Sequence, residues 1–295
     1  MTTYELTELY IVETAVSAAS STISTYRSIL SDFARSCGTM PADKALLLEY
    51  IKQIKEDGNT NNTIRNKISI IKGFVSWGFN NGYYTTNFAE SVKMPIPEHK
   101  IADRMSKDEV HTMFHTAAPK GMHNQVRNRA IMELAIITAS RVSALCNLKR
   151  CDVDLTAKTI RLTHTKRNKD LELPLTESVC KSLEQYIANE RPQELTDNDY
   201  LFVGERKING SFVPLTRQQI YNITKKYTAN ACGRALSPHK LRHTSATLQI
   251  ESGKLTLDEI SKNLGHSSVS TTQRYAQRLN DAPRKEATKA VFEDL

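Results

Sequence analysis

The chain has 295 residues, 39% of them hydrophobic, which is enough to bury a core in each of two domains. It contains no apolar run of eighteen residues, which argues against a membrane-spanning helix, and no secretory signal at its start, so we expect a cytoplasmic protein. The net charge of +8 is unevenly distributed along the chain. Residues 1–100 hold ten basic and ten acidic side chains, and residues 101–295 hold the remaining thirty basic and twenty-two acidic ones. This excess suggests a polyanionic partner such as nucleic acid.

The cysteines carry little information about chemistry. No two of them form a C-x-x-C pair, the spacing of many zinc sites and redox motifs, so we expect reduced thiols, no metal and no cofactor. The five are Cys37, Cys146, Cys151, Cys180 and Cys232.

Residues 1–92 are predicted to form a small domain of four helices with short polar loops. The predicted helices cover residues 4–17, 20–38, 41–58 and 61–82. Apolar residues recur in them at helical spacing, and in the fourth the stripe consists of Ile64, Ile68, Ile71 and Val75. Asn61 or Asn62 is expected to cap this last helix, and the N-N-G sequence at 80–82 to end it.

A linker is predicted at residues 93–105, "KMPIPEHKIADRM", because its two closely spaced prolines cannot continue a helix. The second domain, residues 106–280, is predicted to be mainly α with a small antiparallel β-sheet. Its sheet signal is "KTIRLTHTKRNKDLELPL", where apolar and polar residues alternate on both sides of an R-N-K turn, as in a β-hairpin. The predicted helices cover residues 127–148, 176–190, 215–230, 239–252 and 256–264.

Three short stretches of the second domain hold polar residues that need a common explanation. They are "TASRVSAL" with Arg141, "PHKLRHTSATL" with His239 and Arg242, and "LGHSSVSTTQRYAQ" with His266 and Tyr275. An arginine among apolar residues must find a partner or face a cavity. His239 and Arg242 are three residues apart near a helix N-terminus, where an anion is favoured. Tyr275, in contrast, has little apolar surface around it.

These groups suit chemistry on a phosphodiester. Two guanidiniums match its two non-bridging oxygens, and the Tyr275 hydroxyl can attack phosphorus once cationic neighbours favour the phenolate. The leaving sugar oxygen then needs a proton, which a histidine or a lysine can donate. Lys166 and Lys169 lie near the predicted hairpin turn.

Other protein classes share part of this pattern. His239 and His243 are spaced like the zinc ligands of a nuclease or metallohydrolase, but Lys240 stands where the H-E-x-x-H motif has its general base. A non-catalytic DNA-binding or architectural protein would explain the basic charge without any chemistry. A type IB topoisomerase would use the same tyrosine chemistry without requiring a specific site.

The segment "HKLRHTSATLQIESGKLTLDEISKNLGHSSVSTTQRYAQ" closely resembles the C-terminal signature of the tyrosine recombinases, the phage-integrase and Xer-like family of site-specific DNA recombinases. The resemblance covers nearly the whole chain. "NTIRNKISIIKGFVSWGFNNG" resembles the helices of the family's core-binding domain, and "RNRAIMELAIITASRVSALCNLKRCDVDL" resembles its first arginine motif. It implies an N-terminal helical core-binding domain followed by a tyrosine-recombinase catalytic domain.

The resemblance also implies a role for each residue. Tyr275 would attack the scissile phosphate and form a 3′-phosphotyrosyl link, and Arg141, Arg242 and His266 would contact the non-bridging oxygens. Lys166 would be the general acid, assisted by His239, with Lys169 as the alternative lysine. Religation to a partner strand would need neither ATP nor a metal, and two such exchanges through a Holliday junction would recombine two duplexes.

Two departures from the family pattern stand beside the first arginine. The usual G-L-R is Ala139, Ser140 and Arg141 here, and Ala144 stands where the family has a carboxylate that orients the basic residues. We therefore expect modest activity, or a substitute acid such as Glu133.

The resemblance gives the remaining segments roles as well. The two domains are expected to close around double-stranded DNA, with Arg27, Arg65, Lys67 and Lys72 as candidate phosphate contacts. Residues 281–295 are expected to form a helix or tail that docks on a neighbouring protomer within a DNA-bound homotetramer. No membrane is involved in this interpretation.

Overall fold

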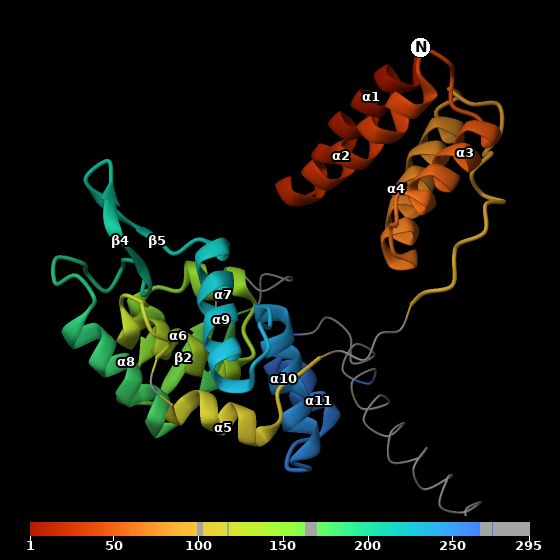
Figure 1. Cartoon of the computed structure of the whole chain (residues 1–295). Coiled ribbons are helices and arrows are strands. Elements are labelled where there is room, and N and C mark those ends of the chain that lie inside the picture. The colour runs from red at the N-terminus through yellow and green to blue at the C-terminus, as the bar shows by residue number, and fades with distance from the viewer. Residues whose placement is uncertain (99–102, 117, 163–169, 266–272, 274–295) are drawn as a thin grey trace, which may run out of the picture. The chain divides into compact units, whose positions relative to one another are not determined.

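The computed structural model describes residues 1–98, 103–116, 118–162, 170–265 and 273, and divides the chain into two compact units. Unit 1 is Met1–Ile101 and unit 2 is Ala102–Leu295 (Figure 1). The fold is mainly α with small antiparallel sheets, which confirms the predicted fold class. Within the described ranges, no helix is both long enough and apolar enough to cross a membrane.

Unit 1 consists of four helices, close to the predicted ones. They are α1 (Thr3–Ala15), α2 (Ser20–Cys37), α3 (Lys44–Glu56) and α4 (Asn61–Asn80). The predicted stripe on α4 is buried throughout, and it packs with Leu30 and Phe33 of α2. The cap of α4 was predicted wrongly: Thr60, not Asn61 or Asn62, accepts the bond from the Thr63 N–H.

Both ends of the predicted linker are bonded to a unit. Arg65 donates to the carbonyl of Pro95 at 2.5 Å, and the Asn61 N–H donates to the Glu98 carboxylate at 2.9 Å. At the other end, Asp103 forms an ion pair with Arg234. Residues 95–98 are therefore part of unit 1, and the attachment to unit 2 begins at residue 103.

Unit 2 contains the remaining helices and the strands. The helices are α5 (Lys107–His115), α6 (Gln125–Thr138), α7 (Val142–Asn147), η1 (Arg150–Asp152), α8 (Glu177–Asn189), α9 (Arg217–Cys232), α10 (Pro238–Glu251) and α11 (Leu257–Asn263). The strands are β1 (Val153–Asp154), β2 (Thr159–Leu162), β3 (Leu171–Pro174), β4 (Val203–Ile208) and β5 (Ser211–Pro214).

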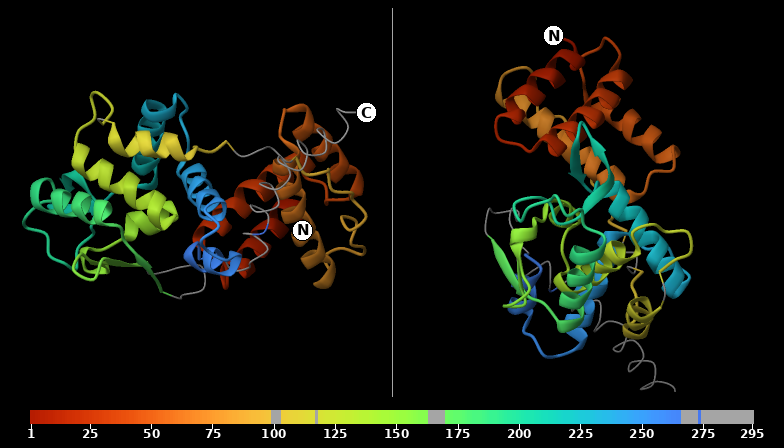
Figure 2. Two further views of the ribbon diagram at one scale, coloured as in Figure 1. Left: turned by 90° about the horizontal axis from the view of Figure 1, so that it is seen from below. Right: turned by 90° about the vertical axis from the view of Figure 1, so that its left-hand side faces the viewer.

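The predicted hairpin is present as β2 and β3, paired antiparallel with Ile160 opposite Leu173, and β1 adds a third strand. Its R-N-K turn lies outside the described residues. A second hairpin, β4 and β5, was not predicted and projects from the body of unit 2 (Figure 1; Figure 2, right). Asn209 and Gly210 connect its strands with positive φ angles of 51° and 79°, as a two-residue type I′ turn requires.

The single helix predicted over 127–148 is in fact two helices. α6 ends at Thr138, and Ala139 adopts the left-handed conformation (φ 48°, ψ 30°) before α7 begins at Val142. Thr138 and Ser140 are part of the reason, because short hydroxyl side chains can bond to nearby groups and compete with continued helix. Arg141 is consequently the N-cap residue of α7, with extended backbone.

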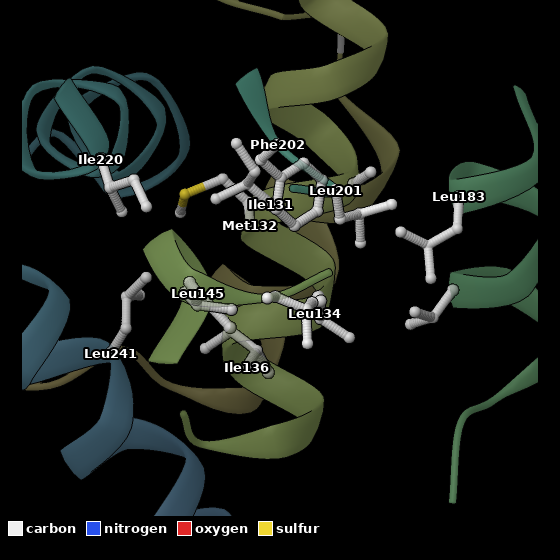
Figure 3. Packing of buried hydrophobic residues seen from close by; sticks show 14 of the residues in the cluster. Ile131, Met132, Leu134, Ile136, Leu145, Leu183, Leu201, Phe202, Ile220 and Leu241 are labelled. Atoms are coloured by element: carbon white, nitrogen blue, oxygen red, sulfur yellow. The ribbon is translucent and has the colours of Figure 1, made fainter. Parts of the chain in front are cut away.

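α6 is the central helix of unit 2. Its side chains Ile131, Met132, Leu134 and Ile136 meet residues of α7, α8, α9 and α10 on different sides (Figure 3). A helix that is buried nearly all round cannot shift without disturbing this packing. The C-terminal end of α6 is therefore a fixed point in the unit.

Candidate active site

Arg242 is a buried arginine on α10, only 7% exposed. Ser237 caps this helix by accepting a bond from the Lys240 N–H. The guanidinium donates from Nη1 to the Ala139 carbonyl at 2.7 Å and from Nη2 to the Leu264 carbonyl. Two carbonyl acceptors on two terminal nitrogens fix the plane of the guanidinium.

Arg141 bonds to the residue that follows Leu264. It is half-buried, and its Nη2 donates to the Gly265 carbonyl at 3.3 Å. Within the part of the chain that the structure describes, the Gly265 carbonyl is the one acceptor of the Arg141 side chain, which leaves its other N–H groups for a ligand. The sequence left open whether Arg141 has a partner or faces a cavity, and in the structure it bonds to a backbone carbonyl.

The end of α11 holds both arginines. The last carbonyls of a helix have no partner within it, so those of Leu264 and Gly265 can accept bonds from Arg242 and Arg141. Gly265 has φ 56°, the left-handed conformation that glycine adopts most easily at such a helix end. Two arginines more than a hundred residues apart are thus aligned by two consecutive residues.

A small apolar cluster locks these elements together. Ala139, Ala246, Ile260 and Leu264 pack against one another, and each is at most 1% exposed. They come from the end of α6, from α10 and from α11, which are the segments that supply the arginines and their acceptors. The packing of this cluster therefore fixes the backbone segments that position the two guanidiniums.

His239 occupies the second position of α10, after Pro238, two residues beyond the cap residue Ser237. The sequence predicts that it shares a helical face with Arg242, but the structure leaves His239 exposed while Arg242 is buried. His243, its partner in the zinc interpretation, has Nδ1 3.2 Å from the Thr247 hydroxyl. Within the described ranges, no group of three His, Cys, Asp or Glu side chains could hold a metal ion.

The other predicted catalytic residues lie outside the described residues. They are Lys166, its alternative Lys169, His266 and Tyr275. The predicted tail at 281–295 lies outside as well. In sequence, however, His266 directly follows Gly265, so its backbone begins at the residue that binds Arg141.

Glu133, the residue named as a possible substitute for the family's carboxylate, bonds to residues other than the two arginines. It is buried, and its two oxygens accept bonds from Arg129 at 2.9 Å and from Ser182 at 2.5 Å. Its carboxylate is thus directed toward α8 and the preceding turn of α6, away from the end of the helix. The Ala144 N–H donates to the Arg141 carbonyl at 2.9 Å.

The four basic residues predicted to contact DNA from unit 1 all have intramolecular partners. Arg27 pairs with Glu8 at 3.5 Å, and Lys72 donates to the Glu90 carbonyl at 3.1 Å. Lys67 lies 3.4 Å from Asp32 with its side chain only 19% exposed. Like Arg65 at Pro95, these side chains would have to exchange a protein partner for a phosphate.

Sequence reasoning missed a basic groove in unit 2. It has a volume of about 880 Å³ and lies between α9, the β4–β5 hairpin and the start of α6. Arg206 and Lys226 line it and have no hydrogen-bond or ion-pair partner among the described residues, and the buried Arg127 lies in its wall. The N-G turn was the available signal for the hairpin, but no sequence pattern brings Arg206 to Lys226.

Comparisons with known proteins indicate the family and the fold. The Phage integrase family profile matches residues 103–281. The tyrosine recombinase XerD of Staphylococcus haemolyticus is 32% identical over 236 residues, 79% of this chain and 77% of that protein. The tyrosine recombinase XerC of Herpetosiphon aurantiacus is 31% identical over 272 residues, 88% and 85% of the two chains. The fold resembles the Tn1549 transposon integrase in complex with a circular intermediate DNA (TM-score 0.76, 18% identity, 93% and 95% coverage).

Proposed function

Because the chain belongs to the phage integrase family of tyrosine recombinases, we propose that it is a site-specific DNA recombinase that cleaves and rejoins strands through a 3′-phosphotyrosyl intermediate. The observation that carries the proposal is the convergence of Arg141 and Arg242 on the end of α11. That helix end leads directly into the sequence that contains His266 and Tyr275.

The proposed chemistry is a transfer of a phosphoryl group between two oxygens. The Tyr275 hydroxyl gives its proton to water and attacks the scissile phosphorus, and the bond from phosphorus to the 5′ oxygen breaks. Arg141, Arg242 and His266 stabilise the charge that develops on the non-bridging oxygens. Lys166, assisted by His239, donates the proton that makes the leaving oxygen a 5′-hydroxyl.

The reverse reaction rejoins the strand. A 5′-hydroxyl from a partner duplex attacks the phosphotyrosine, and the tyrosine leaves, so the phosphodiester is restored without ATP or a metal. Two rounds exchange both strands through a Holliday junction. We place the reaction in a homotetramer on synapsed double-stranded DNA, with residues 281–295 docked on a neighbouring protomer. The biological role is integration or excision of a mobile element, or resolution of cointegrates or dimers.

A suicide-substrate assay tests the cleavage step. Nicked duplexes made from the sequences that flank the gene lose a short 5′-hydroxyl fragment on cleavage, which traps the protein on the DNA. We expect a covalent adduct that forms in EDTA with the wild-type protein. We expect no adduct with Tyr275→Phe, which should bind the same duplex with unchanged affinity.

The outcomes separate the alternatives. Strand cleavage that leaves no adduct and stops in EDTA would point to a metal-dependent nuclease. Equal DNA activities in the wild-type protein and Tyr275→Phe would point to a non-catalytic DNA-binding protein. Relaxation of supercoiled DNA without a specific site would indicate a topoisomerase.

A further inference from the structure

The missing carboxylate at position 144 raises the question of what orients the two arginines. Among the described residues, three backbone carbonyls accept bonds from them, those of Ala139, Leu264 and Gly265. A peptide carbonyl can orient a guanidinium as a carboxylate does, but it carries no net charge. The carbonyl of Ala139 is unusual among the three, because Ala139 is an alanine in the left-handed conformation.

A chain of buried hydroxyls flanks Ala139. The Thr138 hydroxyl donates to the Leu134 carbonyl at 2.7 Å, and the Ser140 hydroxyl lies 2.5 Å from the Thr138 oxygen. Because a hydroxyl has one proton, and that of Thr138 is used on Leu134, Ser140 must be the donor to Thr138. Thr138 is 2% exposed and Ser140 is 6% exposed, so neither hydroxyl can readily exchange its partner for water.

The hydrogen bond between the Thr138 and Ser140 hydroxyls spans Ala139. The left-handed conformation of Ala139 (φ 48°, ψ 30°) reverses the direction of the backbone. This reversal is consistent with the hydrogen bond between the side chains on either side of Ala139. The same reversal ends α6 and presents the Ala139 carbonyl to Arg242 at 2.7 Å. An alanine in this conformation has to be held there, because its Cβ is strained.

We propose that Thr138 and Ser140 are positioning residues for the recombination chemistry: their hydroxyl pair fixes Ala139 so that its carbonyl orients Arg242, in place of the carboxylate absent at position 144. The proposal rests on the proposed function for its link to catalysis. It does not depend on that function for its effect on Arg242.

The test variant removes both hydroxyls. Thr138→Val with Ser140→Ala keeps the shape of both side chains approximately and leaves no buried hydroxyl without a partner. The matched control is Thr224→Val on α9, because Thr224 is also buried and also donates to the carbonyl four residues earlier, that of Ile220 at 2.8 Å. Only the first variant should disturb Arg242.

Single-turnover cleavage of the suicide duplex is the first measurement. We expect the double variant to cleave roughly 10- to 100-fold more slowly, as for a small misplacement of a catalytic group, with unchanged duplex affinity. Thr224→Val should cleave at the wild-type rate. A wild-type rate for the double variant, or an equal loss in Thr224→Val, would overturn the proposal.

Ala144→Glu supplies the matching rescue. In the wild-type background the arginines are already oriented, so the added carboxylate should change the rate by less than about threefold. In the Thr138→Val, Ser140→Ala background it should recover most of the lost rate. A large gain in the wild-type background without rescue of the double variant would contradict the proposal.

The second measurement needs no DNA. In protein labelled with 15N-arginine, the bonds to Ala139 and Leu264 should slow rotation about the Cζ–Nη bonds of Arg242 and give it resolved Nη–H signals. We expect these signals to broaden in the double variant and to persist in Thr224→Val. If the wild-type protein forms no adduct, the proposed function fails, but this experiment still decides whether Thr138 and Ser140 position Arg242.

Discussion

Ala139 combines a strained backbone with a fully buried side chain. The left-handed conformation costs an alanine about 1–2 kcal/mol, and its buried methyl group contributes about 0.8 kcal/mol. Because these effects oppose each other, we expect Ala139→Gly to change the free energy of unfolding by less than about 1 kcal/mol. Equilibrium unfolding in urea measures this change.

Two comparisons make the Ala139 experiment decisive. Ala130→Gly, at a fully buried position in the middle of α6, has no strain to relieve and should cost roughly 2 kcal/mol. Ala139→Val puts a branched side chain into the left-handed region and should cost about 3 kcal/mol or more. A loss in Ala139→Gly as large as that in Ala130→Gly would show that the strain is absent.

Glu133 provides a test of the division between stability and chemistry. Glu133→Gln removes the charge that faces Arg129 and weakens the bond from Ser182, so the protein should lose about 1–3 kcal/mol of stability. The rate of adduct formation per folded molecule should stay within about twofold of the wild-type rate. A tenfold slower rate in fully folded protein would mean that Glu133 helps to orient the basic residues after all.

The limits of sequence reasoning are visible at single residues. The arginines Arg141 and Arg242 could be predicted as site residues because a charged group in an apolar stretch demands an explanation. Their acceptors could not, because every residue has a backbone carbonyl and only the fold decides which one is presented. Thr138 and Ser140 could not be predicted as positioning residues either, because isolated hydroxyl side chains form no periodic sequence pattern.

Among the elements, long amphipathic helices were predicted and interruptions were not. The burial of Ile64, Ile68, Ile71 and Val75 on α4 follows from their spacing. The break between α6 and α7 has no proline or glycine to signal it, because Ala139 is an alanine in a conformation that glycine usually takes. The site therefore lies where the local sequence rule fails, as expected for a functional position.

The core of unit 2 contains tyrosines that should make it sensitive to alkaline pH. Burial raises the pKa of Tyr186 and of Tyr227 to about 12, and their hydroxyls donate to the carbonyls of Leu201 and Gln125. The unfolded chain loses these protons near pH 10, earlier than the folded chain. Their contribution is thus complete below pH 10 and is lost as the pH rises toward 12, by about 2–3 kcal/mol per tyrosine.

Urea unfolding at a series of pH values measures this dependence. Tyr186→Phe should flatten the decline between pH 10 and 12, because no proton is then lost at that position. Tyr4→Phe is the control, since Tyr4 is 55% exposed. An unchanged slope in Tyr186→Phe would contradict burial as the cause of the raised pKa.

The groove beside the β4–β5 hairpin supplies a prediction about DNA binding. If Arg206 and Lys226 contact phosphates, Arg206→Ala with Lys226→Ala should reduce the slope of log affinity against log salt by about 2, near one per contact. Titration of a labelled duplex between low and moderate salt gives this slope. Arg35→Ala with Lys52→Ala removes equal charge from side chains paired with Asp32 and Glu56, and should leave the slope unchanged.

At the scale of the whole molecule, the excess positive charge lies in the same part of the chain as the candidate active site. Residues 1–100 carry equal numbers of basic and acidic side chains, so the net charge of +8 belongs to the part that holds Arg141, Arg242 and the groove. Unit 1 contributes a separate core, and the bonds at Glu98 and Asp103 attach the connecting segment to each unit. In the proposed DNA complex, both units bind the same duplex and are joined by a short segment of the chain.

This connection should be measurable as effective concentration. A fragment of residues 103–295 keeps the whole core of unit 2 and should fold and bind a duplex, but about 100-fold more weakly than the full chain, because the contacts of unit 1 are no longer held nearby. Adding residues 1–98 as a separate chain at micromolar concentration should not restore the affinity. Fluorescence anisotropy with one labelled duplex at fixed salt compares the three samples. A fragment that binds as tightly as the full chain would confine the grip to unit 2 and remove the phosphate contacts proposed for Arg27, Arg65, Lys67 and Lys72.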